Sequence, residues 1–411
     1  MKIEIRKGTN PLGGRTIEFA TGTSKVLLDV GCEFDGLDLP LPETEGPSDP
    51  ASFDAVILAS FHTDRLGAVY AQYPPDRVQV GEKSFAAMRA MDLYRGRAAT
   101  PPAGFLEHGR PVRAGDLTIV PFLADCASFD TWFFEVSAGA ESILYAGDFR
   151  LNGRKPFAWL LRELPGKASA LIAEAPGVEE SPDAVGASDT GSPPAGSGSS
   201  PRNEQEFEYA LIDLFHRTTG PILALVPPLD ADRLVSVHRA AKVTKRLLLE
   251  ELQLAVVASA VGTPMPGPMD HDDVKTFVTR YDERGHPRNA LYARFDGPRR
   301  IGRSGIAKER FVLCVRPSML SFVRLLAKDV PMADGLLVYA MDRAYRDTPA
   351  MREFLDGCEA LGLRVVTLEV RNGPDGRSLR KLADHVRSDL FLPIRSTDRG
   401  WFPNLPHGRG E

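Results

Sequence analysis

The sequence lacks the features that mark disulfide-bonded, secreted and membrane-spanning proteins. Its 411 residues include only four cysteines, which lie far apart and form no CxxC pair. Such thiols in a long chain fit a reducing compartment better than a disulfide framework. The chain has no apolar run of about 18 residues, the length that a membrane helix needs. Its first ten residues, MKIEIRKGTN, contain no apolar stretch of the signal-peptide kind. We therefore expect a cytoplasmic protein with no membrane span.

A strong excess of one charge is also absent. The 50 Lys and Arg residues nearly balance the 55 Asp and Glu residues, giving a net charge of −5. This balance identifies no partner and argues against strong non-specific binding to nucleic acid. The hydrophobic content of 43% is typical of a folded protein. A chain of this length exceeds one ordinary core, so we expect two domains or one elaborated domain.

Short apolar segments rich in β-branched and aromatic residues alternate with amphipathic segments along most of the chain, which predicts an α/β fold. A stretch of Gly, Ser, Pro and Ala interrupts this pattern and predicts a flexible loop, because it cannot bury enough apolar surface to fold. The predicted organisation is a first part of the core over 1–180, the loop over 181–202, a second α/β domain over 203–335, and a segment completing the core over 336–411.

The stretch VILASFHTDRLGAVY runs as an apolar strand into a polar turn that contains His62, Asp64 and Arg65. A His and an Asp two residues apart at the end of a buried strand are typical of a metal site. The neighbouring Arg points the other way, because a guanidinium has no lone pair to offer a cation. From these residues alone, a metal turn, a disabled metal turn and an ordinary loop all remain open.

Several ordered motifs resemble the metallo-β-lactamase fold, and most closely its RNA-processing branch with an inserted β-CASP domain. The motifs that carry the resemblance are KVLLDVG, ILASFHTDRLGA, PFLADCASFD, ILYAGDFRLNGRKP, ADRLVSVHRAAK, RFVLCVRPSML and LFLPIRST. The resemblance spans almost the whole chain. It implies an αββα sandwich with an inserted α/β domain, closed by the C-terminal segment.

The resemblance also implies a reaction centre of two divalent ions, held by His and Asp side chains, that activates a bridging water. His62 and Asp64 match ligands of the first turn, and Asp148 matches the bridging Asp. Four further ligand His positions are occupied by other residue types, namely Ser60, Arg65, Cys126 and Arg395. A later turn that carries a His in this branch reads VRNGPDG here. Asp64 and Asp148 are therefore either vestigial or, if the protein is active, catalytic.

The exchange of two ligands for arginine suggests that guanidiniums replace the charge of the second ion. We predict an ion network of Arg65 and Arg395 with Asp64 and Asp148, because two carboxylates without a cation would repel each other. Arg65 could instead be an ordinary surface residue after a turn. Glu174 either contacts this network or only begins a loop; both readings stay open.

A single ion on His62, Cys126 and Asp148 is the alternative, since these three side chains could hold zinc or manganese with one open position. Cys126 could equally be a buried small hydrophobe. The remaining histidines match no ligand position of the motifs, and we interpret His216 and His238 as surface or packing residues. These histidines are His108, His216, His238, His271, His286, His385 and His407.

The segment 284–310 contains eight basic and two acidic residues, with Tyr292 and Phe295 between them. Such a patch could contact phosphates while its aromatics stack on bases, although a solvated loop explains the same pattern. The candidate phosphate-binding residues are Arg299, Arg300, Arg303, Lys308 and Arg310.

Three functions are compatible with these features. The first is a non-catalytic binding or scaffolding protein that needs no cofactor. The second is a hydrolase of the phosphodiesterase or ribonuclease kind that uses one zinc or manganese ion. The third, which overlaps the first, is a protein that recognises RNA without cutting it. The sequence identifies neither a protein partner nor a substrate.

Overall fold

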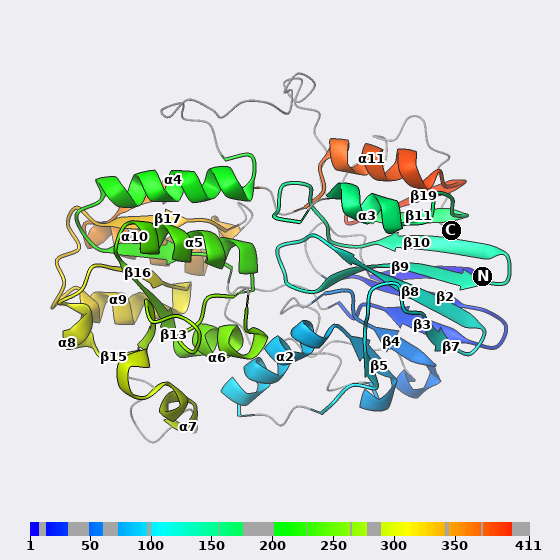
Figure 1. Ribbon diagram of the computed structural model, residues 1–411, viewed down its shortest axis with the longest axis horizontal. Coiled ribbons are helices and arrows are strands. Elements are labelled where there is room, and N and C mark those ends of the chain that lie inside the picture. The colour runs from blue at the N-terminus through cyan, green and yellow to red at the C-terminus, as the bar shows by residue number, and fades with distance from the viewer. Residues whose placement is uncertain are drawn as a thin grey trace.

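The chain folds into two α/β units joined side by side (Figure 1). In this computed structural model, the described residues are 1–7, 14–31, 49–60, 73–96, 100–155, 157–175, 201–227, 229–263, 265–277, 289–341, 345–370 and 373–396. The α/β class expected from the alternating pattern is confirmed.

The first unit contains two six-stranded sheets. The first sheet has the order β1-β2-β3-β4-β5-β6, in which β3 to β6 run parallel. Its strands are β1 (Lys2–Lys7), β2 (Thr16–Ala20), β3 (Lys25–Leu28), β4 (Ala55–Ile57), β5 (Val78–Val80) and β6 (Gly104–Phe105). The second sheet has the order β19-β11-β10-β9-β8-β7, in which β19, β11 and β10 run parallel. Its strands are β7 (Val112–Ala114), β8 (Leu117–Ala124), β9 (Thr131–Ala138), β10 (Glu141–Ala146), β11 (Ala170–Glu174) and β19 (Leu390–Ile394).

Strands of the first unit are apolar throughout because both of their faces are covered. Along β10, Ile143 and Tyr145 point into the core between the two sheets, while Leu144 points to the opposite face, under helices. Those helices are α3 (Phe157–Glu163) and α11 (Gly376–Val386), and α2 (Glu82–Tyr94) covers the outer face of the other sheet. The result is four layers, helix–sheet–sheet–helix (Figure 1).

The second unit is a seven-stranded parallel sheet with helices on both faces. Its order is β15-β14-β13-β16-β12-β17-β18. The strands are β12 (Ile222–Leu225), β13 (Leu247–Glu251), β14 (Val274–Phe277), β15 (Arg300–Ile301), β16 (Phe311–Cys314), β17 (Leu336–Tyr339) and β18 (Arg364–Thr367). One face packs against α4 (Glu204–Arg217), α5 (Ala231–Val243) and α6 (Leu252–Val261), and the other against α9 (Leu320–Leu326) and α10 (Pro349–Ala360). Two short helices, α7 (Asn289–Tyr292) and α8 (Arg303–Ile306), lie near the β15 edge.

The second unit extends further along the chain than residue 335, where we expected it to end. Strands β17 and β18 pair in register with each other, and β17 pairs with β12, so residues up to about 367 belong to the seven-stranded sheet. The sequence pattern of a strand, a helix and a strand is the same whichever sheet the strands join. The boundary between the two units therefore depends on which strands pair, and the pattern does not show this. Among the described residues after β18, α11 and β19 return to the first unit. The predicted loop over 181–202 lies almost entirely outside the described residues.

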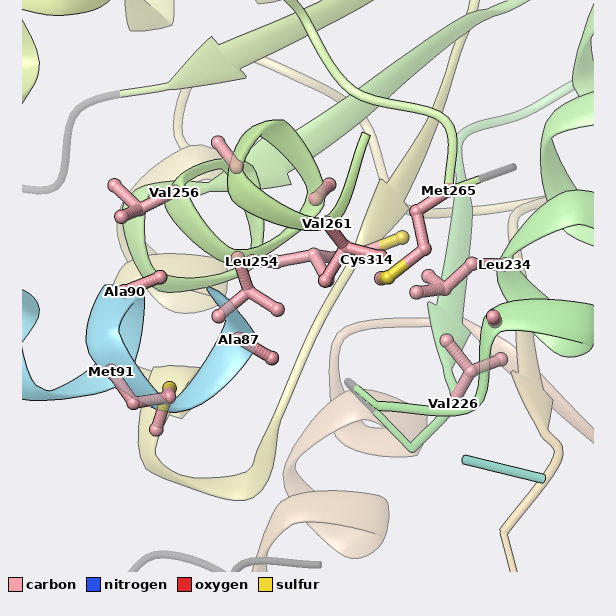
Figure 2. Packing of buried hydrophobic residues seen from close by; sticks show 14 of the residues in the cluster. Ala87, Ala90, Met91, Val226, Leu234, Leu254, Val256, Val261, Met265 and Cys314 are labelled. Atoms are coloured by element: carbon pink, nitrogen blue, oxygen red, sulfur yellow. The ribbon is translucent and has the colours of Figure 1, made fainter. Parts of the chain in front are cut away.

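The two units share a hydrophobic contact between α2 and α6 (Figure 2). Ala87, Ala90 and Met91 of α2 lie against the α6 side chains Leu254 and Val256, all of them buried. Burial of several such side chains stabilises the contact, because each contributes about 1–3 kcal/mol when removed from water. Among the residues that the structure describes, no helix is long and apolar enough to cross a membrane.

Candidate functional site: a buried arginine–carboxylate network

Charged and polar side chains converge where strands of the two sheets end. Asp29 follows β3, Ser60 follows β4, Asp148 follows β10, Glu174 ends β11 and Arg395 follows β19. The carboxyl ends of parallel strands meet at one edge of a sheet, which brings these residues together within each sheet. The Oγ of Ser60 lies 3.3 Å from the Asp148 Oδ2 and links the two edges.

Arg15 lies at the centre of this network, with a fully buried side chain. It immediately precedes β2, whose antiparallel pairing with β3 places it beside Asp29. Its Nε donates to the Asp29 Oδ2 at 2.7 Å, and its Nη2 donates to the Asp148 Oδ2 at 3.2 Å. Its Nη1 donates to Glu174. One guanidinium therefore joins three carboxylates that lie at the ends of three different strands. We call Arg15, these three carboxylates and Arg395 the Arg15 network.

The Arg15 network keeps its central guanidinium charged. Burial alone would lower the pKa of Arg15, but the neighbouring Asp148, Tyr145 and Asp29 outweigh it and raise the pKa well above the usual value. Asp29 is itself saturated, because it also accepts from the Tyr145 hydroxyl at 2.7 Å and from the Ala59 N–H at 2.8 Å. These contacts fix the carboxylate and the guanidinium in one geometry.

Arg395 contacts two of the same carboxylates. Its Nη1 donates to the Glu174 Oε1 at 3.2 Å and lies 3.7 Å from the Asp148 Oδ1. Arg395 and Asp29 have φ angles of 52° and 57°, a left-handed conformation that residues other than glycine adopt rarely. Such conformations persist where surrounding contacts hold them, and they gather at functional positions.

The structure thus places Arg395 and Asp148 together, while the rest of the predicted network lies outside the described residues. His62, Asp64 and Arg65 fall in the segment 61–72, so neither the Asp64–Arg65 contact nor the single-ion alternative is tested. Cys126 follows β8, is buried and forms no disulfide. The Arg150 N–H donates to the Asp125 carbonyl at 3.0 Å, which places the end of β8 beside the loop after β10.

Sequence reasoning missed Arg15 and the role of Asp29. Arg15 stands in the segment LGGRTIEFA, between a glycine pair and an unremarkable strand, and no ligand motif contains it. The available signal was indirect: Asp29 in KVLLDVG follows a buried strand and needs a cationic partner if it lacks a metal. Glu174, whose role was open, does contact both arginines.

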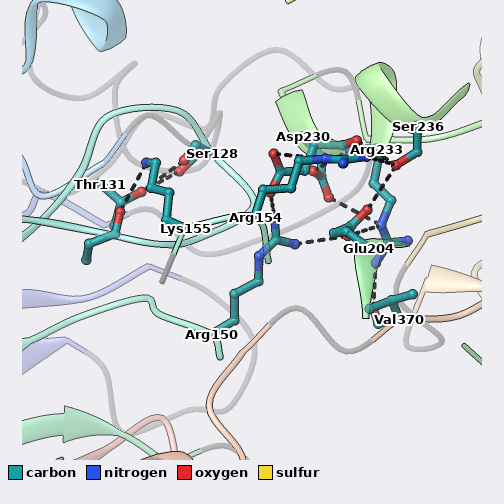
Figure 3. Close-up of polar contacts among 12 residues, drawn as sticks. Ser128, Thr131, Arg150, Arg154, Lys155, Glu204, Asp230, Arg233, Ser236 and Val370 are labelled. Carbon is teal, nitrogen blue, oxygen red and sulfur yellow. Dashed lines mark hydrogen bonds and ion pairs between the residues drawn. The ribbon is translucent and has the colours of Figure 1, made fainter. Parts of the chain in front are cut away.

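A second buried ion cluster joins the two units, shown in Figure 3. Arg150, from the GDFR motif after β10, contacts Glu204 of α4 at 3.2 Å and also Asp232 of α5. Arg233 of α5 donates from its Nε to the Glu204 Oε1 at 2.7 Å and reaches main-chain carbonyls near β17 and β18. Asp230 caps α5, as expected from an acidic residue at the helix start.

Asp125 lies at the edge of this cluster with an unusual titration. Burial raises its pKa to about 6, an effect that Arg150 opposes and Asp232 reinforces. Its Oδ2 has no hydrogen-bond partner among the described residues. The carboxyl group therefore changes charge near pH 6.

The predicted phosphate-binding residues are exposed on the second unit, in the stretch that runs through β15 and α8 to the start of β16, but their aromatic neighbours are buried. The exposed basic residues are Arg299, Arg300, Arg303, Lys308 and Arg310. Arg300 pairs with Asp296 at 3.1 Å, and Arg303 pairs with Asp329. Tyr292 and Phe295 are only 3% and 1% exposed and pack in the hydrophobic core. The reading in which these two rings stack on bases does not hold, because both are buried in the hydrophobic core.

Comparisons with known proteins define the fold but no activity. No protein-family model matches the chain, and no curated protein matches its sequence. The chain is similar over its full length to a protein of unknown function from Enterococcus faecalis V583, with 15% identity, a TM-score of 0.71 and 97% of that protein covered. This likeness shows a shared fold alone.

Metallo-β-lactamase-fold proteins align with only part of the chain. The metallo-β-lactamase-fold protein YhfI from Bacillus subtilis matches at 13% identity and a TM-score of 0.31, over 42% of this chain and 71% of that protein. Zinc-bound PqqB from Methylobacterium extorquens matches at 13% identity and a TM-score of 0.30, over 40% of this chain and 61% of that protein. Likenesses of this extent carry no argument about chemistry.

Proposed function

We propose that this chain is a metallo-β-lactamase-like protein with a β-CASP-like inserted unit, in which the Arg15 network takes the place of a dinuclear metal centre. It acts by binding or scaffolding and not by metal-dependent hydrolysis. The observation that carries the proposal is the fully buried Arg15, whose three donors engage Asp29, Asp148 and Glu174.

The network removes the lone pairs that a metal would need. The Oδ2 of Asp148, which corresponds to the bridging ligand, already faces Arg15 and Ser60, and its Oδ1 faces Arg395. A divalent ion there would have to displace a charge-assisted contact and lie close to two guanidiniums. Charge is nearly balanced without an ion, since two arginines face three carboxylates among the described residues.

A metal measurement on variants tests this proposal. We expect Asp148→Asn and Cys126→Ala to leave the protein's zinc and manganese content unchanged, because neither residue is a ligand. Loss of about one equivalent of metal in both variants would refute the proposal and favour the hydrolase that uses His62, Cys126 and Asp148. Elemental analysis of purified full-length protein after exposure to each metal gives the stoichiometry, and metal bound elsewhere is insensitive to these two substitutions.

For the bound ligand we propose RNA or another phosphate-bearing molecule, contacted by the exposed basic residues in the stretch that runs through β15 to the start of β16. Support comes from five exposed cationic side chains on one short stretch. Two of them, Arg300 and Arg303, would have to exchange an acidic partner at the surface for a phosphate. Because Tyr292 and Phe295 are buried, binding should be dominated by phosphate contacts and be weak and salt-dependent.

Anisotropy titration of a labelled single-stranded oligoribonucleotide at two salt concentrations tests the ligand. Removing one phosphate contact should weaken the salt dependence, reducing the magnitude of the negative slope of log K against log salt by about 0.7. We expect this for Arg299→Ala and Lys308→Ala, and no change for Arg217→Ala, an exposed arginine on α4. Equal effects of all three substitutions, or no binding by the wild type, would rule out this ligand.

A further inference from the structure

Two histidines and an aspartate converge at the amino ends of β13 and β14, away from the Arg15 network. His238 lies on α5, and His271 and Asp273 lie on the loop that leads into β14. Each offers one ligand-type atom, and these atoms all lie within 4.8 Å of one another. His238 stands eight residues beyond Asp230, the α5 cap in the inter-unit cluster, or about 12 Å along the helix axis.

The contacts within this group leave polar atoms unsatisfied. The Nε2 of His238 lies 3.1 Å from the Asp273 Oδ1, yet the contact lacks the geometry of a hydrogen bond. The Oδ2 of Asp273 is also buried and has no hydrogen-bond partner among the described residues. The side chain of His238 is only 9% exposed, so water does not readily satisfy it. Buried polar atoms without partners are costly, and an unfilled ligand site explains them.

The second imidazole makes a simple His–Asp pair an incomplete description. The rings of His238 and His271 lie 4.7 Å apart between centroids and are tilted by 58°. A divalent cation satisfies all three side chains at once, because each can present a lone pair to it.

The loop holds its two ligands in place through the main chain. The His271 N–H donates to the Gly267 carbonyl at 3.1 Å, and the Val274 N–H donates to the His271 carbonyl at 3.2 Å. The Asp273 carbonyl accepts from the Leu248 N–H at 2.9 Å, which ties the loop to β13. The positions of His271 and Asp273 are therefore set by the sheet, and His238 reaches them from the helix above.

We propose that His238, His271 and Asp273 bind one divalent transition-metal ion, with zinc as the best fit. Two imidazoles and one carboxylate match the donor set of a three-ligand zinc site, which keeps a fourth position for water. Bonds of about 2.0–2.2 Å in a tetrahedral site hold ligand atoms about 3.3 Å apart, so the side chains need only small rotations. The ion clips α5 to the start of β14 and leaves one exchangeable position.

Zinc titration of the metal-free, full-length protein against a chromophoric chelator tests the site. We expect one equivalent to bind, and the affinity to fall by about 100-fold or more in His271→Ala and in Asp273→Asn. His216→Ala, which removes an exposed histidine on α4, should bind like the wild type. Cobalt in place of zinc should give the visible absorption of a tetrahedral site, lost in the same two variants.

Two outcomes would overturn the inference. One is a wild type that binds no stoichiometric zinc. The other is binding that survives in both His271→Ala and Asp273→Asn but disappears in Cys126→Ala, which would place the metal in the first unit. Asp273→Asn preserves the size of the side chain, so a matched thermal unfolding curve of metal-free protein separates lost binding from lost folding.

Discussion

Replacing Arg15 with methionine removes the cation at the centre of three buried carboxylates. Removing one partner of a buried ion pair costs about 3–5 kcal/mol, because the other charge is left uncompensated. Here Asp29, Asp148 and Glu174 all lose a donor, and the side chain of Arg15 is 0% exposed, so water cannot replace it. We therefore expect Arg15→Met to lower the free energy of unfolding by about 5 kcal/mol, a large part of the 5–15 kcal/mol typical of proteins.

The pH dependence of this loss identifies its cause. Without Arg15 the buried carboxylates prefer their protonated form, so their folded-state pKa values rise above the unfolded values. The penalty is then absent at pH below the unfolded pKa values and grows as the pH rises. Urea unfolding followed by tryptophan fluorescence should show a larger difference between wild type and variant at pH 7 than at pH 5.

A matched substitution provides the control. Arg113→Met on β7 removes an exposed arginine and should change stability by less than about 0.5 kcal/mol. Arg15→Lys should fall between wild type and Arg15→Met, since an ammonium keeps the charge but cannot present the same planar set of donors. A loss below about 1 kcal/mol in Arg15→Met, or an equal loss at both pH values, would show that the network does not stabilise the fold through charge.

Two further predictions concern buried acids, each measured by urea unfolding across pH. Burial raises the pKa of Glu250 well above its usual value, and neither carboxyl oxygen has a hydrogen-bond partner among the described residues. The free energy of unfolding of the wild type should therefore fall as the pH rises above the unfolded pKa, by up to about 1.4 kcal/mol per pH unit. Glu250→Gln has no carboxylate to ionise, so its stability relative to the wild type should increase between pH 5 and 8. A stability difference that does not change with pH would contradict this. The pKa of Asp125 rises from 3.8 to about 6, so its stabilising contribution is complete below pH 3.8 and is lost by about pH 6. The wild type should thus lose about 3 kcal/mol of stability between pH 3.8 and 6 through this group, and Asp125→Asn should not. The same pH dependence of stability in wild type and variant would contradict the prediction.

The regular part of the fold was readable from the sequence, since β-branched runs and amphipathic segments carry their own periodicity. Strand ends were readable too: Asp148 and Arg395 follow the strands that their motifs indicated. Arg15 was not, because its role depends on antiparallel pairing between β2 and β3 and on Glu174 from another sheet. Tyr292 illustrates the same limit, since an aromatic among basic residues reads as a surface residue until tertiary packing buries it.

The place of the second unit within the chain sets an order for folding during synthesis. Strand β11 pairs with β19, and Glu174 meets Arg395, although these two residues are 221 positions apart. While the ribosome makes the whole second unit, β11 is therefore a sheet edge without its final neighbour, and such edges recruit other strands. A chain that stops after β18 should keep the seven-stranded sheet but expose that edge in the first unit. We expect such truncated chains to aggregate through the first unit. The segment of α11 and β19 prevents this in the full chain, because it covers the β11 edge.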